Sequence, residues 1–160
     1  MPRMDYRRVG QDVFKAMGEL QTHVDNSGLD PVLLNLVYLR VSEINGCAYC
    51  IDMHSKDLRA MGESDIRLDL INVWRETPSL YSEQEQAALA WAESVTKVSE
   101  THIPDEDFQL ARKHFSEEEL AKLNLAIVAI NGWNRLAISA RMDPGLYKSS
   151  LKPVKQTASV

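Results

Sequence analysis

Apolar residues recur three to four positions apart along most of this chain, which is the spacing of a helix that buries one face. The pattern predicts a first helix over about Val9 to Val24. Asp30-Pro31, an N-cap residue and a proline at the first helical position, introduces a segment from Val32 to Ile44 that is apolar on most sides. This segment predicts a buried helix. No stretch shows the alternation of a half-buried strand, so the predicted fold class is all-α.

Turn and capping residues divide the rest of the chain into further helices. Ser82 and Ser116 are each followed three residues later by glutamate, the arrangement of a capping box. The remaining predicted helices span about 47–61, 64–73, 82–98, 104–115 and 116–130, with a last one from the turn at Asn131-Gly132 to about Arg141. The short helix over 64–73 is expected to turn three side chains inward, Ile66, Leu70 and Val73.

The length of 160 residues fits one domain, predicted over residues 1–143, with residues 144–160 as a C-terminal tail. One short motif repeats within it. Ile44-Asn45-Gly46-Cys47 recurs 86 residues later as Ile130-Asn131-Gly132-Trp133, and a long apolar helix is predicted before each copy. The repeat predicts an internal duplication of a helix–turn–helix unit, of which only the first copy carries cysteines.

Composition and charge limit the classes of partner. The formal net charge of −5 and the pI near 5.4 come without a basic stripe, which argues against nucleic acid as a partner. No apolar run approaches the roughly 20 residues needed to cross a bilayer, and the N-terminus lacks the apolar core of a signal peptide. We therefore expect a cytoplasmic protein. In that compartment two neighbouring cysteines indicate catalysis or metal binding rather than a structural disulfide.

The two cysteines of the chain, Cys47 and Cys50, form a Cys-x-x-Cys motif directly after Asn45-Gly46. A helix that begins here places both thiols in its first turn, where free backbone N–H groups and the helix dipole favour a thiolate. His54 follows one turn later on the same face and can exchange protons with the thiols. A thiolate attacks peroxides and disulfides, so the motif predicts a redox site.

The spacing also predicts a reaction cycle. Residues i and i+3 of a helix lie within the Cα separation of about 7 Å that a disulfide tolerates. One thiolate attacks the peroxide and becomes a sulfenic acid, and the second thiol then closes a Cys47–Cys50 disulfide. Proximity to His54 favours Cys50 as the attacking thiol, whereas the helix dipole favours Cys47, and we prefer Cys50. The other histidines show no spacing that completes a four-ligand zinc site, so we expect neither metal nor cofactor.

The run Arg40-Val41-Ser42-Glu43-Ile44-Asn45-Gly46-Cys47-Ala48-Tyr49-Cys50-Ile51-Asp52-Met53-His54-Ser55-Lys56 resembles the core motif of the carboxymuconolactone decarboxylase superfamily, in its alkylhydroperoxidase (AhpD-like) branch. The resemblance extends over roughly residues 32–141. It implies an all-α fold that assembles as a homo-oligomer, a trimer or a hexamer. It also implies peroxide reduction through the two cysteines, with electrons supplied by a dithiol or lipoyl-type protein reductant.

Two positions depart from that family pattern. Asn35 stands where the family carries a glutamate oriented toward the histidine, and Tyr49 stands where some members have a histidine. Glu43 is the nearest upstream carboxylate and is a candidate to replace the missing acid if the turn folds it back. Tyr49 is a packing residue that is also a candidate donor to the substrate oxygen.

The predicted function is a thiol-dependent peroxidase that reduces hydrogen peroxide or organic hydroperoxides. Two alternatives stay open. A lyase like the lactone decarboxylase that names the superfamily needs no redox pair, so Cys47 and Cys50 count against it. A non-catalytic redox sensor needs the pair but turns over only once per oxidation event.

Overall fold

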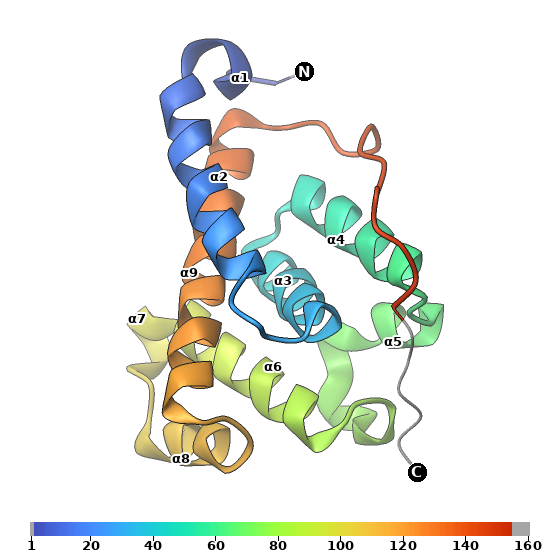
Figure 1. Cartoon of the computed structure of the whole chain (residues 1–160), viewed down its shortest axis with the longest axis vertical. Helices are drawn as coiled ribbons and strands as arrows, with labels where there is room; N and C mark the ends of the chain where they lie inside the picture. The colour runs from blue at the N-terminus through green and yellow to red at the C-terminus, as the bar shows by residue number, and fades with distance from the viewer. Residues whose placement is uncertain (1, 155–160) are drawn as a thin grey trace.

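The computed structural model describes residues 2–154, and all regular structure in that range is helical, which confirms the all-α prediction (Figure 1). The first half contains α1 (Tyr6–Val9), α2 (Gln11–Asp25), α3 (Pro31–Asn45), α4 (Ala48–Met61) and α5 (Asp65–Asp69). The second half contains the 3₁₀ helices η1 (Ile71–Glu76) and η2 (Pro78–Leu80), then α6 (Glu83–Thr96), α7 (Val98–Thr101), α8 (Asp105–His114) and α9 (Glu117–Ala140). Both predicted capping boxes, at Ser82 and Ser116, are present.

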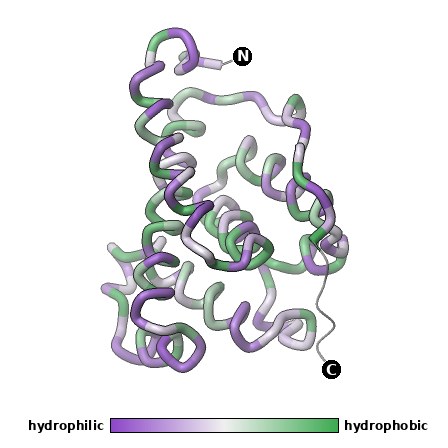
Figure 2. The backbone as a smooth tube through the Cα atoms, viewed as in Figure 1, coloured by the Kyte–Doolittle hydropathy of each residue, from purple (hydrophilic) through white to green (hydrophobic). Residues whose placement is uncertain are grey.

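Helix α3 is the centre of the fold and contacts α4, α6 and α9. Its start is fixed as predicted, because the Asp30 carboxylate accepts a hydrogen bond from the Leu33 N–H and Pro31 occupies the first turn. Leu36, Val37 and other apolar side chains along it are almost completely buried, and its trace is mostly green in Figure 2. Because α3 is surrounded on several sides, it carries the apolar run that the sequence shows.

The prediction of a turn at Asn131-Gly132 is wrong, since α9 runs unbroken from Glu117 to Ala140. The side-chain amide of Asn131 donates a hydrogen bond to the Ile127 carbonyl oxygen of the same helix at 2.9 Å. Its amide oxygen accepts a hydrogen bond from Asn45 at 3.0 Å, so the two asparagines of the repeated motif contact each other. The predicted duplication of a helix–turn–helix unit therefore fails in its second copy, which has no turn.

The prediction of which side chains face inward in residues 64–73 is also wrong. Ile66 and Val73 are 52% and 39% exposed, while Leu68, Ile71 and Trp74 are buried. The backbone passes from α5 into the 3₁₀ helix η1 in this region. A 3₁₀ helix has three residues per turn, so its buried side chains follow a spacing of three instead of 3.6.

Residues 144–154 of the predicted tail lie along α4 (Figure 1). The Lys56 ammonium donates to the carbonyl oxygens of Gly145 and Tyr147, at 3.2 and 3.1 Å. Further along, the Val154 N–H donates to the carbonyl oxygen of Met61 at 3.0 Å. Residues 155–160 of the predicted tail lie outside the described residues. None of the helices in the described range is both long and apolar enough to cross a membrane.

Glycine substitutions test the helical assignments. Gly18 lies inside α2, and a Cβ added there meets no atom within 4 Å. We expect Gly18→Ala to raise the free energy of unfolding by about 0.5–1 kcal/mol, because alanine loses less backbone entropy in a helix. Gly62 follows the last residue of α4 with a φ of +96°, a conformation that strains alanine. Gly62→Ala should therefore lower the free energy of unfolding. Urea denaturation of both variants measures the two shifts, and a loss of stability in Gly18→Ala would contradict the assignment.

Candidate functional site

The two cysteines lie at the start of α4, as predicted. Gly46 ends α3 with a φ of +70°, and this turn places Cys47 at the N-cap of α4. The Cys47 sulfur accepts a hydrogen bond from the Cys50 N–H at 3.3 Å, the role that a cap oxygen usually has. The two residues form a disulfide with a Cα–Cα separation of 5.3 Å. Their side chains are therefore close enough for reversible disulfide chemistry within one helical turn.

The structure also brings His54 and Asn35 together. The His54 Nδ1 lies 3.1 Å from the Asn35 side-chain oxygen, and the Asn35 amide nitrogen donates to the Pro31 carbonyl oxygen at 2.9 Å. Because the Asn35 amide nitrogen is used in this way, its oxygen must accept, and Nδ1 of His54 must carry the proton. The other nitrogen, Nε2, is then a proton acceptor. It is buried and has no hydrogen-bond partner among the described residues.

Burial lowers the pKa of His54 from 6.5 to about 3, so the imidazole is neutral at physiological pH. The Tyr38 ring packs against it at 5.0 Å between centroids. A neutral imidazole with a free Nε2 is the form that can take a proton from a thiol.

This pKa predicts how stability depends on pH. Below pH 6.5 an unfolded His54 binds a proton that the folded protein binds only near pH 3. The free energy of unfolding should therefore fall as the pH falls through this range, by about 1.4 kcal/mol per pH unit from this residue. Urea titrations of the oxidised protein between pH 7.5 and 5 measure the slope. His54→Gln should remove that contribution, whereas replacement of the exposed His23 should not. Equal slopes in wild type and His54→Gln would contradict this interpretation.

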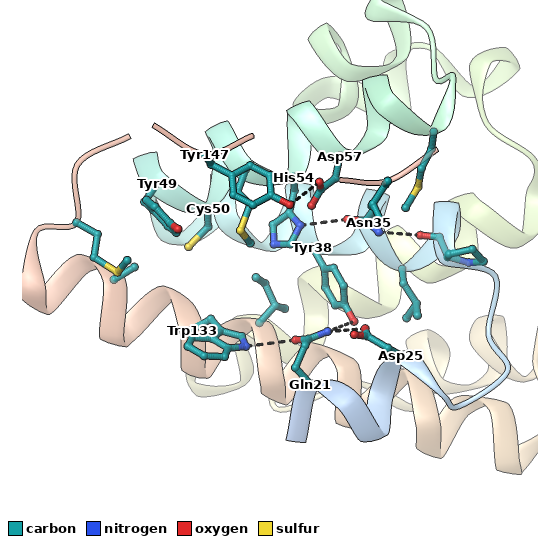
Figure 3. A pocket seen from close by; sticks show the side chains of 18 of the residues that line it. Gln21, Asp25, Asn35, Tyr38, Tyr49, Cys50, His54, Asp57, Trp133 and Tyr147 are labelled. Carbon is teal, nitrogen blue, oxygen red and sulfur yellow. Dashed lines mark hydrogen bonds between the residues drawn. The ribbon is translucent and has the colours of Figure 1, made fainter. Parts of the chain in front are cut away.

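Cys50 and His54 both line a cavity of about 540 Å³ between α2, α3, α4, α9 and the C-terminal segment (Figure 3). Most of its wall is apolar or aromatic, including Phe14, Leu34, Met53, Ile130, Trp133 and Met142. Cys47 does not line this cavity and is buried in a cluster with Cys50 and Ala137. A small molecule in the cavity therefore meets the Cys50 sulfur first.

Sequence reasoning missed several polar residues of the cavity, of which Asp57 and Tyr147 form one pair. Asp57 is buried on α4, and its carboxylate accepts a hydrogen bond from the Tyr147 hydroxyl at 2.8 Å. Burial, reinforced by this bond, raises the pKa of Tyr147 to about 12. Asp57 was detectable, because it continues the face of Cys50 and His54 at helical spacing. Tyr147 had no local signal, since its contact with Asp57 spans 90 residues of sequence.

A second polar group lies at the other end of the cavity. The Gln21 amide donates to the Asp25 carboxylate at 2.8 Å and to the Tyr38 hydroxyl at 3.2 Å. Its oxygen accepts a hydrogen bond from the Trp133 indole at 3.2 Å. Gln21 therefore holds three side chains of the cavity wall in place (Figure 3).

Glu43 does not reach this site. It is absent from the cavity wall, and its carboxylate pairs with the guanidinium of Arg40 at 3.4 Å. Burial raises the pKa of Glu43, with Arg40 opposing the shift. The idea that Glu43 folds back to replace the family glutamate is wrong, because α3 continues in helical form through Asn45 and keeps Glu43 on another face. Tyr49, by contrast, lines the cavity and packs beside the cysteine pair.

Comparison with known proteins places the sequence among relatives. Residues 11–94 match the model of the carboxymuconolactone decarboxylase family. The uncharacterised protein YdfG of Bacillus subtilis is 36% identical over 137 residues, which are 86% of this chain and 92% of YdfG.

Solved structures of similar chains have the same helical fold. One is an Agrobacterium tumefaciens protein of unknown function, described as a putative antioxidant defence protein AhpD. It is 44% identical to this chain with a TM-score of 0.89, and the match covers 92% of this chain and 100% of the Agrobacterium chain. Another is an uncharacterised peroxidase-related protein from Ralstonia eutropha, which shares the fold with a TM-score of 0.74 and is 23% identical. The match covers 85% of this chain and 72% of the Ralstonia chain. The match over more than half of the sequence, with the helical fold around Cys47 and Cys50, shows that this chain belongs to the carboxymuconolactone decarboxylase family, in its AhpD-like branch.

Proposed function

We propose that the protein is a thiol-dependent peroxidase that reduces hydroperoxides through Cys50 and Cys47. The observation that carries the proposal is the cysteine pair at the start of α4, with Cys50 and His54 opening into one cavity. The description of the Agrobacterium relative as a putative antioxidant defence protein supports the same class of activity.

In the reduced protein the Cys50 thiol gives its proton to Nε2 of His54. The thiolate then attacks one peroxide oxygen, the O–O bond breaks, and Cys50 becomes a sulfenic acid. The leaving alkoxide takes the proton from the imidazolium and departs as an alcohol. Because burial makes His54 a weak base, its imidazolium returns the proton readily.

The second half of the cycle restores the thiols. The Cys47 sulfur attacks the Cys50 sulfur, the S–O bond breaks, and the hydroxyl leaves as water with the Cys47 proton. An external dithiol, of the lipoyl or dithiol-protein class, then reduces the disulfide by two exchange steps and is itself oxidised. The net reaction converts one hydroperoxide and one dithiol to one alcohol, one water and one disulfide.

The experiment is a turnover assay on the purified full chain, with cumene hydroperoxide in excess and dihydrolipoamide as the electron donor. A peroxidase consumes many equivalents of peroxide per protein and produces the alcohol in equal amount. A redox sensor consumes about one equivalent and stops, and a lyase consumes none. Failure to exceed one equivalent with dihydrolipoamide and with dithiothreitol would overturn the proposal.

A further inference from the structure

We infer that the cavity selects bulky, uncharged hydroperoxides and rejects anionic ones, and that Asp25 is a residue that determines this specificity. The inference rests on the proposed function and specifies which hydroperoxides are its substrates.

The size and surface of the cavity indicate an apolar substrate. A volume of about 540 Å³ is in the range of sites that hold a small organic molecule, and far exceeds the space that hydrogen peroxide fills. Leu34, Ile130 and Trp133 contribute apolar surface to its wall. An aromatic or aliphatic group attached to the peroxide would bury its surface here, which favours it over hydrogen peroxide.

The charges of the cavity exclude an anion. Two carboxylates, Asp25 and Asp57, line it, and no lysine or arginine does so among the described residues. Burial lowers the pKa of His54 to about 3, and the charge that it gains from the Cys50 proton is matched by the Cys50 thiolate, so it offers no free cation to a substrate. A substrate carboxylate that reaches the Asp25 end meets a charge of the same sign and no counterion from the cavity wall, which disfavours its binding.

Asp25 lies at the opposite end of the cavity from Cys50 (Figure 3). The Gln21 amide fixes the Asp25 carboxylate by the 2.8 Å hydrogen bond, so its negative charge stays at this end. A substrate with its peroxide at Cys50 therefore extends the remainder of the molecule toward Asp25. The nearby Tyr38 hydroxyl accepts from Gln21 and keeps its own proton to donate to an uncharged acceptor, such as an ester or alcohol oxygen.

The test uses two hydroperoxides that differ by one charge, 4-carboxycumene hydroperoxide and its methyl ester. The second-order rate constant for oxidation of the reduced protein is measured in a single turnover, which separates the peroxide step from reduction of the disulfide. We expect the ester to react at least about tenfold faster than the acid at pH 7.5, because only the acid carries an uncompensated charge.

Variants assign the discrimination to Asp25. Asp25→Asn should reduce the ester-to-acid ratio by about threefold, and Asp25→Lys should reduce it further, since lysine supplies the missing cation. The effect of Asp25 should shrink at high ionic strength because the residue is exposed. Asp12→Asn, at the other end of α2 and outside the cavity wall, is the matched control and should leave the ratio unchanged.

The outcomes separate the two proposals. Equal rates for ester and acid, or a ratio that Asp25→Lys does not change, would overturn the specificity while leaving the peroxidase activity standing. If neither compound nor cumene hydroperoxide oxidises the thiols, the proposed function itself fails.

Discussion

Cys50→Ser is expected to abolish hydroperoxide reduction, whereas Cys47→Ser is expected to react once and stop with a sulfenic acid on Cys50. The asymmetry follows from the cavity, because Cys50 lines it and Cys47 does not. Without Cys47, the sulfenic acid has no neighbouring thiol with which to condense. Both serine variants keep a similar volume at a buried position, so a folding defect is not the expected cause of the difference.

Mass spectrometry after one equivalent of cumene hydroperoxide distinguishes these products. Wild type should lose two hydrogens as the disulfide forms, and Cys47→Ser should gain one oxygen, or one adduct when dimedone traps the sulfenic acid. Cys50→Ser should keep its single thiol unmodified over the same time. A sulfenic acid on Cys47 in Cys50→Ser, with no reaction in Cys47→Ser, would reverse the roles that we assign to the two sulfurs.

The cysteine site was predictable because its determinants are local. Asn45-Gly46 marks the turn, and Gly46 does adopt the left-handed conformation there. The spacing of Cys47, Cys50 and His54 then fixes their relative positions on one helix. Asn35 was identified through the family resemblance, and the structure gives its contact, a hydrogen bond to the imidazole.

The remaining features depend on contacts between distant parts of the chain. Asn131-Gly132 has the composition of a turn, yet Asn131 stays helical while it binds Asn45 across the fold. Tyr147 belongs to a segment with turn-rich composition, and its place in the cavity follows from bonds to Lys56 and Asp57 on α4. Local rules carry no information about such pairings, so the sequence alone could not predict the cavity or its polar ends.

His54→Gln is expected to slow the oxidation of Cys50 by about 10²-fold at pH 7. This is the lower end of the range for a positioned acid–base group, because the pKa of His54 lies far below the working pH. The rate should recover in part as the pH rises and the thiol ionises without help. Wild type should show a much flatter profile between pH 6 and 8, since its imidazole stays neutral across that range. His23→Gln, on the exposed face of α2, provides the matched control and should follow wild type.

A second variant tests whether Asn35 positions the imidazole. Asn35→Ala removes the acceptor of the Nδ1 proton, so the imidazole can rotate or change tautomer and Nε2 is no longer held as the free acceptor. We expect a smaller loss of rate than in His54→Gln, with the same recovery at high pH, because both variants weaken the same proton transfer. Stopped-flow tryptophan fluorescence on the reduced proteins measures these rates directly. If His54→Gln reacts as fast as wild type at pH 7, proton transfer through Nε2 is not part of the mechanism, and the first turn of α4 alone must activate Cys50.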